Sequence, residues 1–238
     1  MPVKIGINEL AHGVSDIYVG VDGKARKVAA GYIGVGGKAE QFYSAVPAEW
    51  KFTVETGAEF DIRGKNLVID FGDGSKETVN DPQSMTTISH TYGDSDPHQV
   101  TVTGQIWGVD FHNSHPEYLL SVDTIIPKNK ISSFSSCFSG CTSLTAIPAG
   151  LFDNCPAVTY FYSCFSGCTS LTAIPAGLFD NCPAVTDFSS CFSGCTSLTG
   201  LAPELWDTTR WSHVTQNYRC FYNCTGLSNY ADIPSGWK

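Results

Sequence analysis

The sequence predicts a mainly β chain with short helices, in which a β-hairpin segment and a β-sandwich precede a short α/β solenoid of about four coils. Three observations carry this prediction. A block at residues 136–159 returns letter for letter at 163–186, which gives a period of 27 residues. Short β-rich runs separated by turn formers lie between residues 52 and 103, and a weaker repeat lies before residue 45. A fixed period of about 20 to 50 residues is typical of solenoids, whose coils bury apolar surface against their neighbours.

The first segment, residues 1–45, contains two similar stretches at 17–28 and 31–42. Each alternates β-forming residues with a Gly-containing turn, Asp22-Gly23 or Gly36-Gly37, which predicts two small hairpins. Two-stranded units are marginal in water. We therefore expect this segment to assemble with its own copies or with a larger structure, and the alternative is a β extension packed on the next domain.

The two stretches, IYVGVDGKARKV and GYIGVGGKAEQFY, also resemble a segment at the start of tail and accessory structural proteins of phages and prophages. The resemblance implies attachment to a virion or a phage-derived particle. The implied partners are other virion structural proteins, bound through residues 1–45, and further copies of the chain in a homo-oligomer.

The second segment, residues 46–108, has the pattern of an all-β sandwich. Its β-rich runs are Phe52–Val54, Leu67–Phe71, Thr86–Ile88 and Val100–Thr103. The run VIDFGDGS at 68–75, the HTY at 90–92 and the VTVT at 100–103 resemble the PKD domain, which has an immunoglobulin-like fold. The resemblance implies a spacer or adhesion unit.

The acidic residues of this segment invite a calcium interpretation, because carboxylates are hard oxygen donors. The four candidates are Asp70, Asp73, Asp94 and Asp96. An EF-hand loop needs a longer ligand series that ends in Glu, and Asp-Gly is a common tight-turn dipeptide. We therefore predict a turn at 70–74, no metal, and a hydrogen-bonding role within the sandwich for His90.

Residues 109–130 connect the sandwich to the repeats. Tyr118–Val122 and Ile125–Pro127 look like a degenerate first coil. A solenoid needs such a cap over the apolar end of its stack.

The third segment, residues 131–238, carries the repeats. Apolar residues at i, i+3, i+4 and i+7 predict a short amphipathic helix in each coil, and in the first coil they are Phe134, Cys137, Phe138 and Cys141. A brief strand is expected next, pairing in parallel from coil to coil, at Leu144–Ile147, Leu171–Ile174 and Leu198–Leu201. The outward residues Thr145 and Thr172 would form a small polar face.

The motif CF-x-GC-x-SL-x-x-IP resembles the leucine-rich repeats of bacterial surface antigens over residues 131–230. That family implies adhesion and partner binding. The expected architecture is thus a β-hairpin segment, an Ig-like (PKD) sandwich and a leucine-rich-repeat solenoid with an aromatic C-terminal cap.

All ten cysteines lie after residue 136, and eight of them form Cys-x3-Cys pairs. This spacing differs from the Cys-x2-Cys and Cys-x4-Cys pairs of zinc sites. Buried thiols suit the apolar stripe, so we predict reduced core cysteines. Some disulfides and a metal site are the alternatives.

Aromatic residues of the repeats are the candidate ligand contacts, because such rings stack on sugars and form hot spots in protein interfaces. Capping of the open end of the stack is the alternative, and Trp206 is expected in the core. The third repeat is two residues longer, at Thr208–Arg210, and insertions of this kind often mark a binding face. The candidates are Tyr160, Tyr162, Trp211, Tyr218, Tyr222 and Trp237.

Charge and composition exclude several functions. The net charge is −9, distributed as +1 over residues 1–45, −7 over 46–130 and −3 over 131–238. Without a basic stripe, nucleic-acid binding lacks its main electrostatic contribution. Between residues 131 and 200 the only charged residues are Asp153, Asp180 and Asp187, with no His, so we expect no catalytic site. No cofactor is expected.

Neither an N-terminal signal peptide nor an apolar run of membrane-spanning length is evident. The sequence therefore favours a virion protein made in the host cytoplasm, which displays the repeats toward a host-surface glycan or protein. The alternative is a bacterial cell-surface adhesin.

Overall fold

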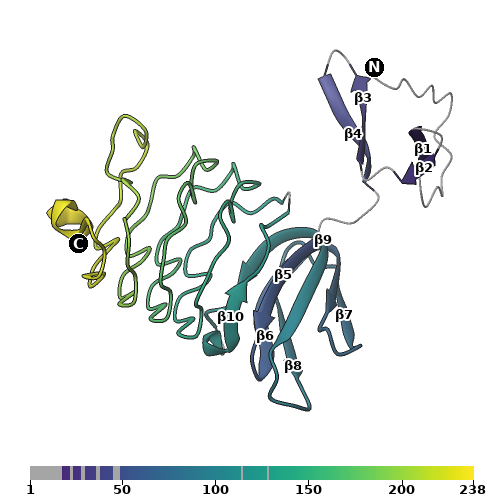
Figure 1. Ribbon diagram of the computed structural model, residues 1–238, viewed down its shortest axis with the longest axis horizontal. Helices are drawn as coiled ribbons and strands as arrows, with labels where there is room; N and C mark the ends of the chain where they lie inside the picture. Colours follow the sequence, from purple (N-terminus) through teal and green to yellow (C-terminus); the bar gives the residue numbers. More distant parts are fainter. Residues whose placement is uncertain are drawn as a thin grey trace. The chain divides into compact units, whose positions relative to one another are not determined.

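In the computed structural model, the described residues are four strands between residues 18 and 44, and residues 49–238 without 114 and 128. The chain divides into two compact units, Met1–Pro47 and Ala48–Lys238, and each is described by itself. The described part is mainly β with little helix, in agreement with the predicted class (Figure 1).

The first unit contains two antiparallel strand pairs. β1 (Tyr18–Val21) pairs with β2 (Lys24–Lys27), and β3 (Ala30–Val35) pairs with β4 (Lys38–Ser44). The two predicted strand pairs are thus present. The predicted turn dipeptides between their strands lie outside the described residues.

The second unit begins with one open antiparallel sheet of six strands (Figure 1). The strand order is β10-β5-β9-β6-β7, and β8 pairs with the N-terminal half of β6 while β7 pairs with its C-terminal half. The strands are β5 (Glu49–Val54), β6 (Gly57–Asp70), β7 (Lys76–Val79), β8 (Thr86–Thr91), β9 (His98–Asp110) and β10 (Leu119–Val122).

The pairing of the two longest strands, β6 and β9, is irregular near the middle, and the sheet curves there over its core. The pairing of β6 with β9 shifts register on either side of residues 64 and 65. Gly104 lies opposite the bend with a φ of +109°. Beyond it, Phe52 of β5 and Phe60 of β6 bring their ring centroids to 5.2 Å, although β9 separates their strands in the sheet. The inward rings thus meet across a folded sheet.

Each of the four predicted β-rich runs of this segment contributes to a strand: β5, β6, β8 and β9 in turn. The alternation of buried and exposed residues along β5 explains this, because Trp50, Phe52 and Val54 face the core. β7 and the full length of β9 were not anticipated, since their polar residues and glycine weaken the strand pattern.

The predicted connector begins at residue 109, but β9 extends to Asp110, so the connector starts at residue 111 and leads from β9 to the first coil. It contains the 3-10 helix η1 (Pro116–Tyr118) and then β10, which pairs with β5. On its other side, Ser121 forms a parallel bridge with Ala146, and the Leu120 carbonyl accepts the Thr145 N–H. The predicted cap segment therefore lies against the first repeat.

The repeats form a stack of coils, residues 131–229, named here the coil stack (Figure 1). Each coil donates backbone N–H groups to carbonyls of the next one: Phe134 to Tyr160, Phe161 to Asp187, and Phe188 to Gln216. Phenylalanine rings stack along the same direction, with centroids 5.1–5.7 Å apart in the series Phe138, Phe165, Phe192 and Phe221. The exact repeat therefore produces columns of identical side chains.

The predicted helix in each coil is wrong. Ser136 and its counterparts Ser163 and Ser190 have φ values of 59°, 53° and 56°, which interrupt a right-handed helix. In this part of each coil, hydrogen bonds of short turns alternate with hydrogen bonds to the next coil. The Cys137 N–H bonds to the Phe134 carbonyl, and the Phe138 N–H bonds to the Cys164 carbonyl. In the described residues helix is limited to three 3-10 turns, η1, η2 (Tyr230–Asp232) and η3 (Ser235–Trp237).

The predicted parallel strands of the coils are also wrong. At 144–147, 171–174 and 198–201, single contacts replace strand ladders, such as the Thr199 N–H bonded to the Thr172 carbonyl. Proline and glycine after these short runs turn the chain before a second bond forms. The expected side-chain directions are confirmed, because Leu144 and Ile147 are buried whereas Thr145 is exposed.

All ten cysteines are buried free thiols. Three of them donate to a carbonyl of the preceding coil at 2.9–3.0 Å: Cys168 to Phe138, Cys195 to Phe165 and Cys224 to Phe192. Burial raises the pKa of Cys155 to about 11 and that of Cys182 to about 12. The thiols therefore pack as small, neutral core side chains.

Candidate functional site

Four of the six predicted site residues are exposed on the coil stack. Tyr160, Tyr162, Tyr218 and Tyr222 are 46%, 48%, 63% and 39% exposed. Alternation explains their direction, because Phe161 between the first two points into the core and is fully buried. We name these four side chains the tyrosine face.

The stacking of the coils sets the spacing of these rings. The Ser136 N–H bonds to the Tyr162 carbonyl, that of Ser163 to Ser189, and that of Ser190 to Tyr218. Tyr162, Ser189 and Tyr218 therefore occupy one column in successive coils. At the usual spacing of paired chains, the two tyrosines lie about 10 Å apart with the small Ser189 between them. The small Ser189 thus stands between two tyrosines of the same column.

A second column runs beside the first. Parallel bridges connect Ser133 to Tyr160, Tyr160 to Asp187 and Asp187 to Gln216. Asp187 is only 6% exposed, and its Oδ1 accepts the Ser189 N–H at 2.7 Å. This carboxylate therefore orders the backbone at Ser189.

Arg219 provides the positive charge of the tyrosine face. Its guanidinium carbon lies 5.0 Å from the Tyr218 ring centroid and 4.8 Å from that of Tyr222. Arg219 occupies the left-handed backbone position that serines fill in earlier coils, with a φ of 56°. Its cation–π contacts hold the two rings near the guanidinium, which is itself a hydrogen-bond donor.

The other two predicted site residues lie in the core. Trp211 and Trp237 are 9% and 6% exposed. Trp211 packs edge-on against Phe188 at 5.6 Å, and the Trp237 carbonyl accepts the Phe221 N–H at 2.7 Å. The prediction that Trp211 and Trp237 are ligand contacts is therefore wrong, because both are buried. Their packing fits the alternative, in which aromatic rings cap the end of the stack.

Trp206, expected in the core, is partly buried there and packs edge-on against Phe221 and Trp237, with centroids 6.3 Å away in each case. Together with η2 and η3, these rings cover the last coil.

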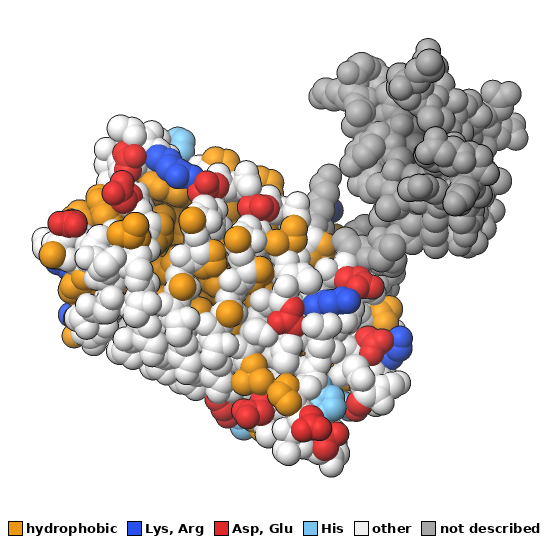
Figure 2. Space-filling view, in the orientation of Figure 1, with side chains coloured by type: hydrophobic (Ala, Val, Ile, Leu, Met, Phe, Trp, Pro, Cys, Tyr) orange, Lys and Arg blue, Asp and Glu red, His pale blue; other side chains and the backbone are white. Residues whose placement is uncertain are grey.

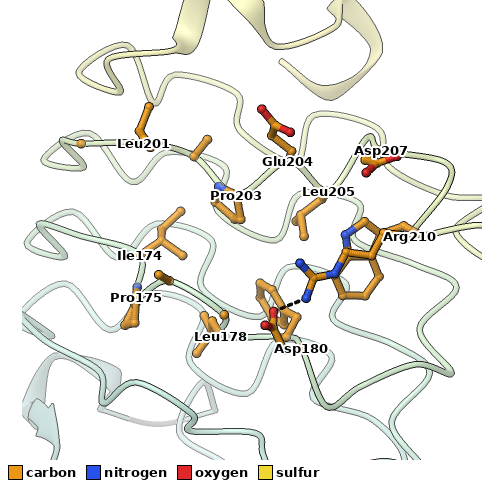
Figure 3. A pocket seen from close by; sticks show the side chains of 16 residues that line it. Ile174, Pro175, Leu178, Asp180, Leu201, Pro203, Glu204, Leu205, Asp207 and Arg210 are labelled. Atoms are coloured by element: carbon orange, nitrogen blue, oxygen red, sulfur yellow. Dashed lines mark ion pairs between the residues drawn. The ribbon is translucent and has the colours of Figure 1, made fainter.

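A groove of about 630 Å³ opens between the second and third coils (Figure 3). Its apolar lining comes from two walls, and Figure 3 shows their side chains facing one another across it. The walls carry Ile174, Pro175 and Leu178 on one side, and Leu201, Pro203 and Leu205 on the other. Three carboxylates and one guanidinium lie at its rim: Asp180, Glu204, Asp207 and Arg210.

A local change in the third repeat creates this groove. Gly200, with a φ of +75°, stands where earlier coils have Ala146 and Ala173, and the following proline is shifted by one residue to Pro203. As a result Leu201 is 70% exposed, whereas the equivalent Ile174 is 9% exposed. The inserted Arg210 forms an ion pair with Asp180 across the groove.

The groove was missed as a site, but its signal was in the sequence. The two-residue insertion at 208–210 marks the affected coil, and Trp211 replaces Cys182 of the previous repeat. Sequence reasoning assigned the binding role to aromatic rings. The groove is lined mainly by aliphatic residues and prolines instead.

The acidic turn of the sheet is held by its own hydrogen bonds. Asp70 accepts the Gly72 N–H at 3.0 Å and Asp73 accepts the Ser75 N–H at 2.8 Å, as the turn interpretation predicts. The Ser75 N–H, followed by the His90 ring at 2.8 Å, lowers the pKa of Asp73 to about 2. His90 also stacks on Phe71 at 4.2 Å. Its predicted structural role is confirmed.

The surface of the coil stack is poor in charge. In the view of Figure 2, hydrophobic side chains lie in rows across it, with charged ones mainly near its ends. Within the part of the chain that the structure describes, no helix is long and apolar enough to cross a membrane.

Comparisons of the chain with protein-family models, curated proteins and solved structures found no match.

Proposed function

We propose that this chain is a non-enzymatic recognition protein of a phage or phage-like particle. In this proposal residues 1–45 attach it to other particle proteins or to further copies of the chain. The sheet acts as an immunoglobulin-like (PKD) spacer, and the coil stack, as a leucine-rich-repeat solenoid, contacts a glycan or protein on the host surface.

The observation that carries the recognition role is the tyrosine face. A chain that buries nearly every phenylalanine of its repeats leaves four tyrosines 39–63% exposed. Tyrosine has an apolar ring with a polar tip, so it binds at low conformational cost. Two tyrosines in one column with the small Ser189 between them favour a flat ligand that stacks on the rings, such as a sugar ring or a planar side chain.

The particle assignment rests on the resemblance of residues 17–43 to segments of phage structural proteins. It is tested by immunogold labelling of cultures that produce the protein. Labelling of purified particles is the expected result. Labelling of the bacterial envelope alone would contradict the particle assignment and favour the adhesin alternative.

A further inference from the structure

The groove between the second and third coils has the size and lining of a ligand site, and it is separate from the tyrosine face. Its volume of about 630 Å³ lies within the range of about 300 to 1,000 Å³ that is usual for ligand pockets. Leu201 at its edge is 70% exposed and extends the apolar wall of the groove to the surface.

Hydrogen bonds and an ion pair position the residues that form the groove. Asn229 fixes the backbone of Ala202 in its wall, accepting the Ala202 N–H at 2.8 Å and donating to the Ala202 carbonyl at 3.1 Å. Arg210 from the insertion pairs with Asp180 and lies over the Trp211 ring, 5.4 Å from its centroid. The wall and the rim are thus both held in place.

The charge of the rim is negative. Asp180 is paired with Arg210, and Glu204 and Asp207 also line the rim. Asp207 accepts two hydrogen bonds from Thr209, at 2.9 and 2.7 Å, so its carboxylate has a fixed position. Glu204 is exposed and, among the described residues, has no ion-pair partner. Arg210 acts on both Asp180 and Asp207, and three carboxylates against this one guanidinium give the rim a net negative charge that complements a cation.

We infer that this groove binds a peptide segment of a partner protein in which apolar side chains stand next to a lysine or arginine. The apolar side chains occupy the space between Ile174, Leu178 and Leu205 and cover Leu201. The cationic group lies at the rim against Glu204 and Asp207. Burial of the apolar group provides affinity, and the rim selects the charge.

The test measures fluorescence anisotropy of three labelled hexapeptides with the full chain. One contains two leucines followed by two lysines, one two leucines followed by two glutamates, and one two serines followed by two lysines. We expect the leucine–lysine peptide to bind at least about tenfold more tightly than either of the others, a difference of about 1.4 kcal/mol.

Two surface substitutions locate the binding. Leu201→Ser and Glu204→Lys each change an exposed side chain, so the fold is retained. Each is expected to weaken the leucine–lysine peptide at least about fivefold. Glu55→Lys makes the same charge change on an exposed residue between β5 and β6 and is expected to leave binding unchanged.

Several results would overturn the inference. Equal binding of the serine–lysine peptide would mean attraction to the net negative chain alone, and equal binding of the leucine–glutamate peptide would remove the role of the rim. Absence of binding, or equal losses in all three variants, would exclude the groove. None of these results bears on the tyrosine face, whose residues are unchanged in this experiment.

Discussion

At the residue scale, two glycines have similar positive φ values but differ in the space available for a side chain. Gly104 has a φ of +109°, and a Cβ there would lie 2.4 Å from the Asn66 carbonyl oxygen. Gly74 has a φ of +96°, but a Cβ there would meet nothing within 4 Å. The bend in the sheet therefore depends on Gly104 in a way that the turn does not depend on Gly74.

We predict that Gly104→Ala lowers the free energy of unfolding by at least about 2 kcal/mol more than Gly74→Ala does. Both substitutions place alanine in the left-handed region, so their difference reports the clash with Asn66. Chemical denaturation of the two variants measures it. Equal losses would show that the close approach at the bend is not needed for stability.

The buried thiols predict instability in alkali. Cys155 and Cys182 have pKa values raised from 9.0 to about 11 and about 12, because burial disfavours the thiolate. Their contribution to stability is complete below pH 9 and is lost as the pH rises through about 9 to 12, because only the unfolded chain ionises readily. In this pH range each of the two thiols lowers the free energy of unfolding by about 1.4 kcal/mol per pH unit.

Denaturant midpoints measured at pH 8 and pH 10 test this expectation. The wild-type chain should lose more stability between the two values than a variant with Cys155→Ala and Cys182→Ala. The same loss in both chains would show that other groups dominate the alkaline transition.

At the scale of elements, the stability of a coil depends on its column of rings. Phe165 is fully buried, with its centroid 5.1 Å from that of Phe138 and 5.3 Å from that of Phe192. A cavity here removes contacts on both sides at once, because each coil buries its apolar surface only against its neighbours.

We therefore expect Phe165→Ala to lower the free energy of unfolding by about 3 to 5 kcal/mol. Thr172→Ala, an exposed change in the same repeat, should stay within about 0.5 kcal/mol. Thermal and denaturant unfolding of both variants make the comparison. A small loss at Phe165 would mean that neighbouring coils close over the cavity.

The coils and most strands were predictable from the sequence, whereas the conformation within each coil was not. The 27-residue period and the alternating runs identified the coils and most strands, since both patterns report burial directly. The predicted helix failed at Ser136, because the spacing i, i+3, i+4, i+7 also fits successive turns whose N–H groups bond to the next coil. Such bonds depend on a neighbouring coil, which local periodicity does not describe.

The candidate site was predictable to a similar degree. Tyr160 and Tyr162 stand where the next repeat has Asp187 and Ser189, a polar pair that indicates exposed positions, and the structure places both tyrosines at the surface. The same reasoning did not separate Tyr218 and Tyr222 from Trp211 and Trp237, because aromatic rings serve equally well in a cap and in a binding surface. Whether each of these rings is exposed or buried depends on the packing of the last coils, which the sequence pattern does not describe.

At the scale of the whole molecule, the second unit is continuous from sheet to cap. Phe111 of the sheet stacks on Phe138 of the first coil at 5.6 Å, and the Phe111 N–H bonds to the Cys137 carbonyl. One hydrophobic core therefore extends from Trp50 to Trp237. The sheet and the tyrosine face therefore belong to one compact unit.

The most direct measurement of the central claim, that the tyrosine face recognises a surface ligand, compares two variants of the full chain. Tyr162→Ser with Tyr218→Ser restores the serines found at Ser135 and Ser189, so the coils are retained. Met85→Ser, at a residue that directly precedes β8 and is 41% exposed, is the control. Binding of labelled wild-type and variant chains is measured on an array of bacterial glycans and on intact bacterial cells.

We expect the wild-type and control chains to bind the same target and the double variant to bind it at least about tenfold more weakly. Equal binding by all three chains, or no target for the wild-type chain on either the array or the cells, would contradict the central claim.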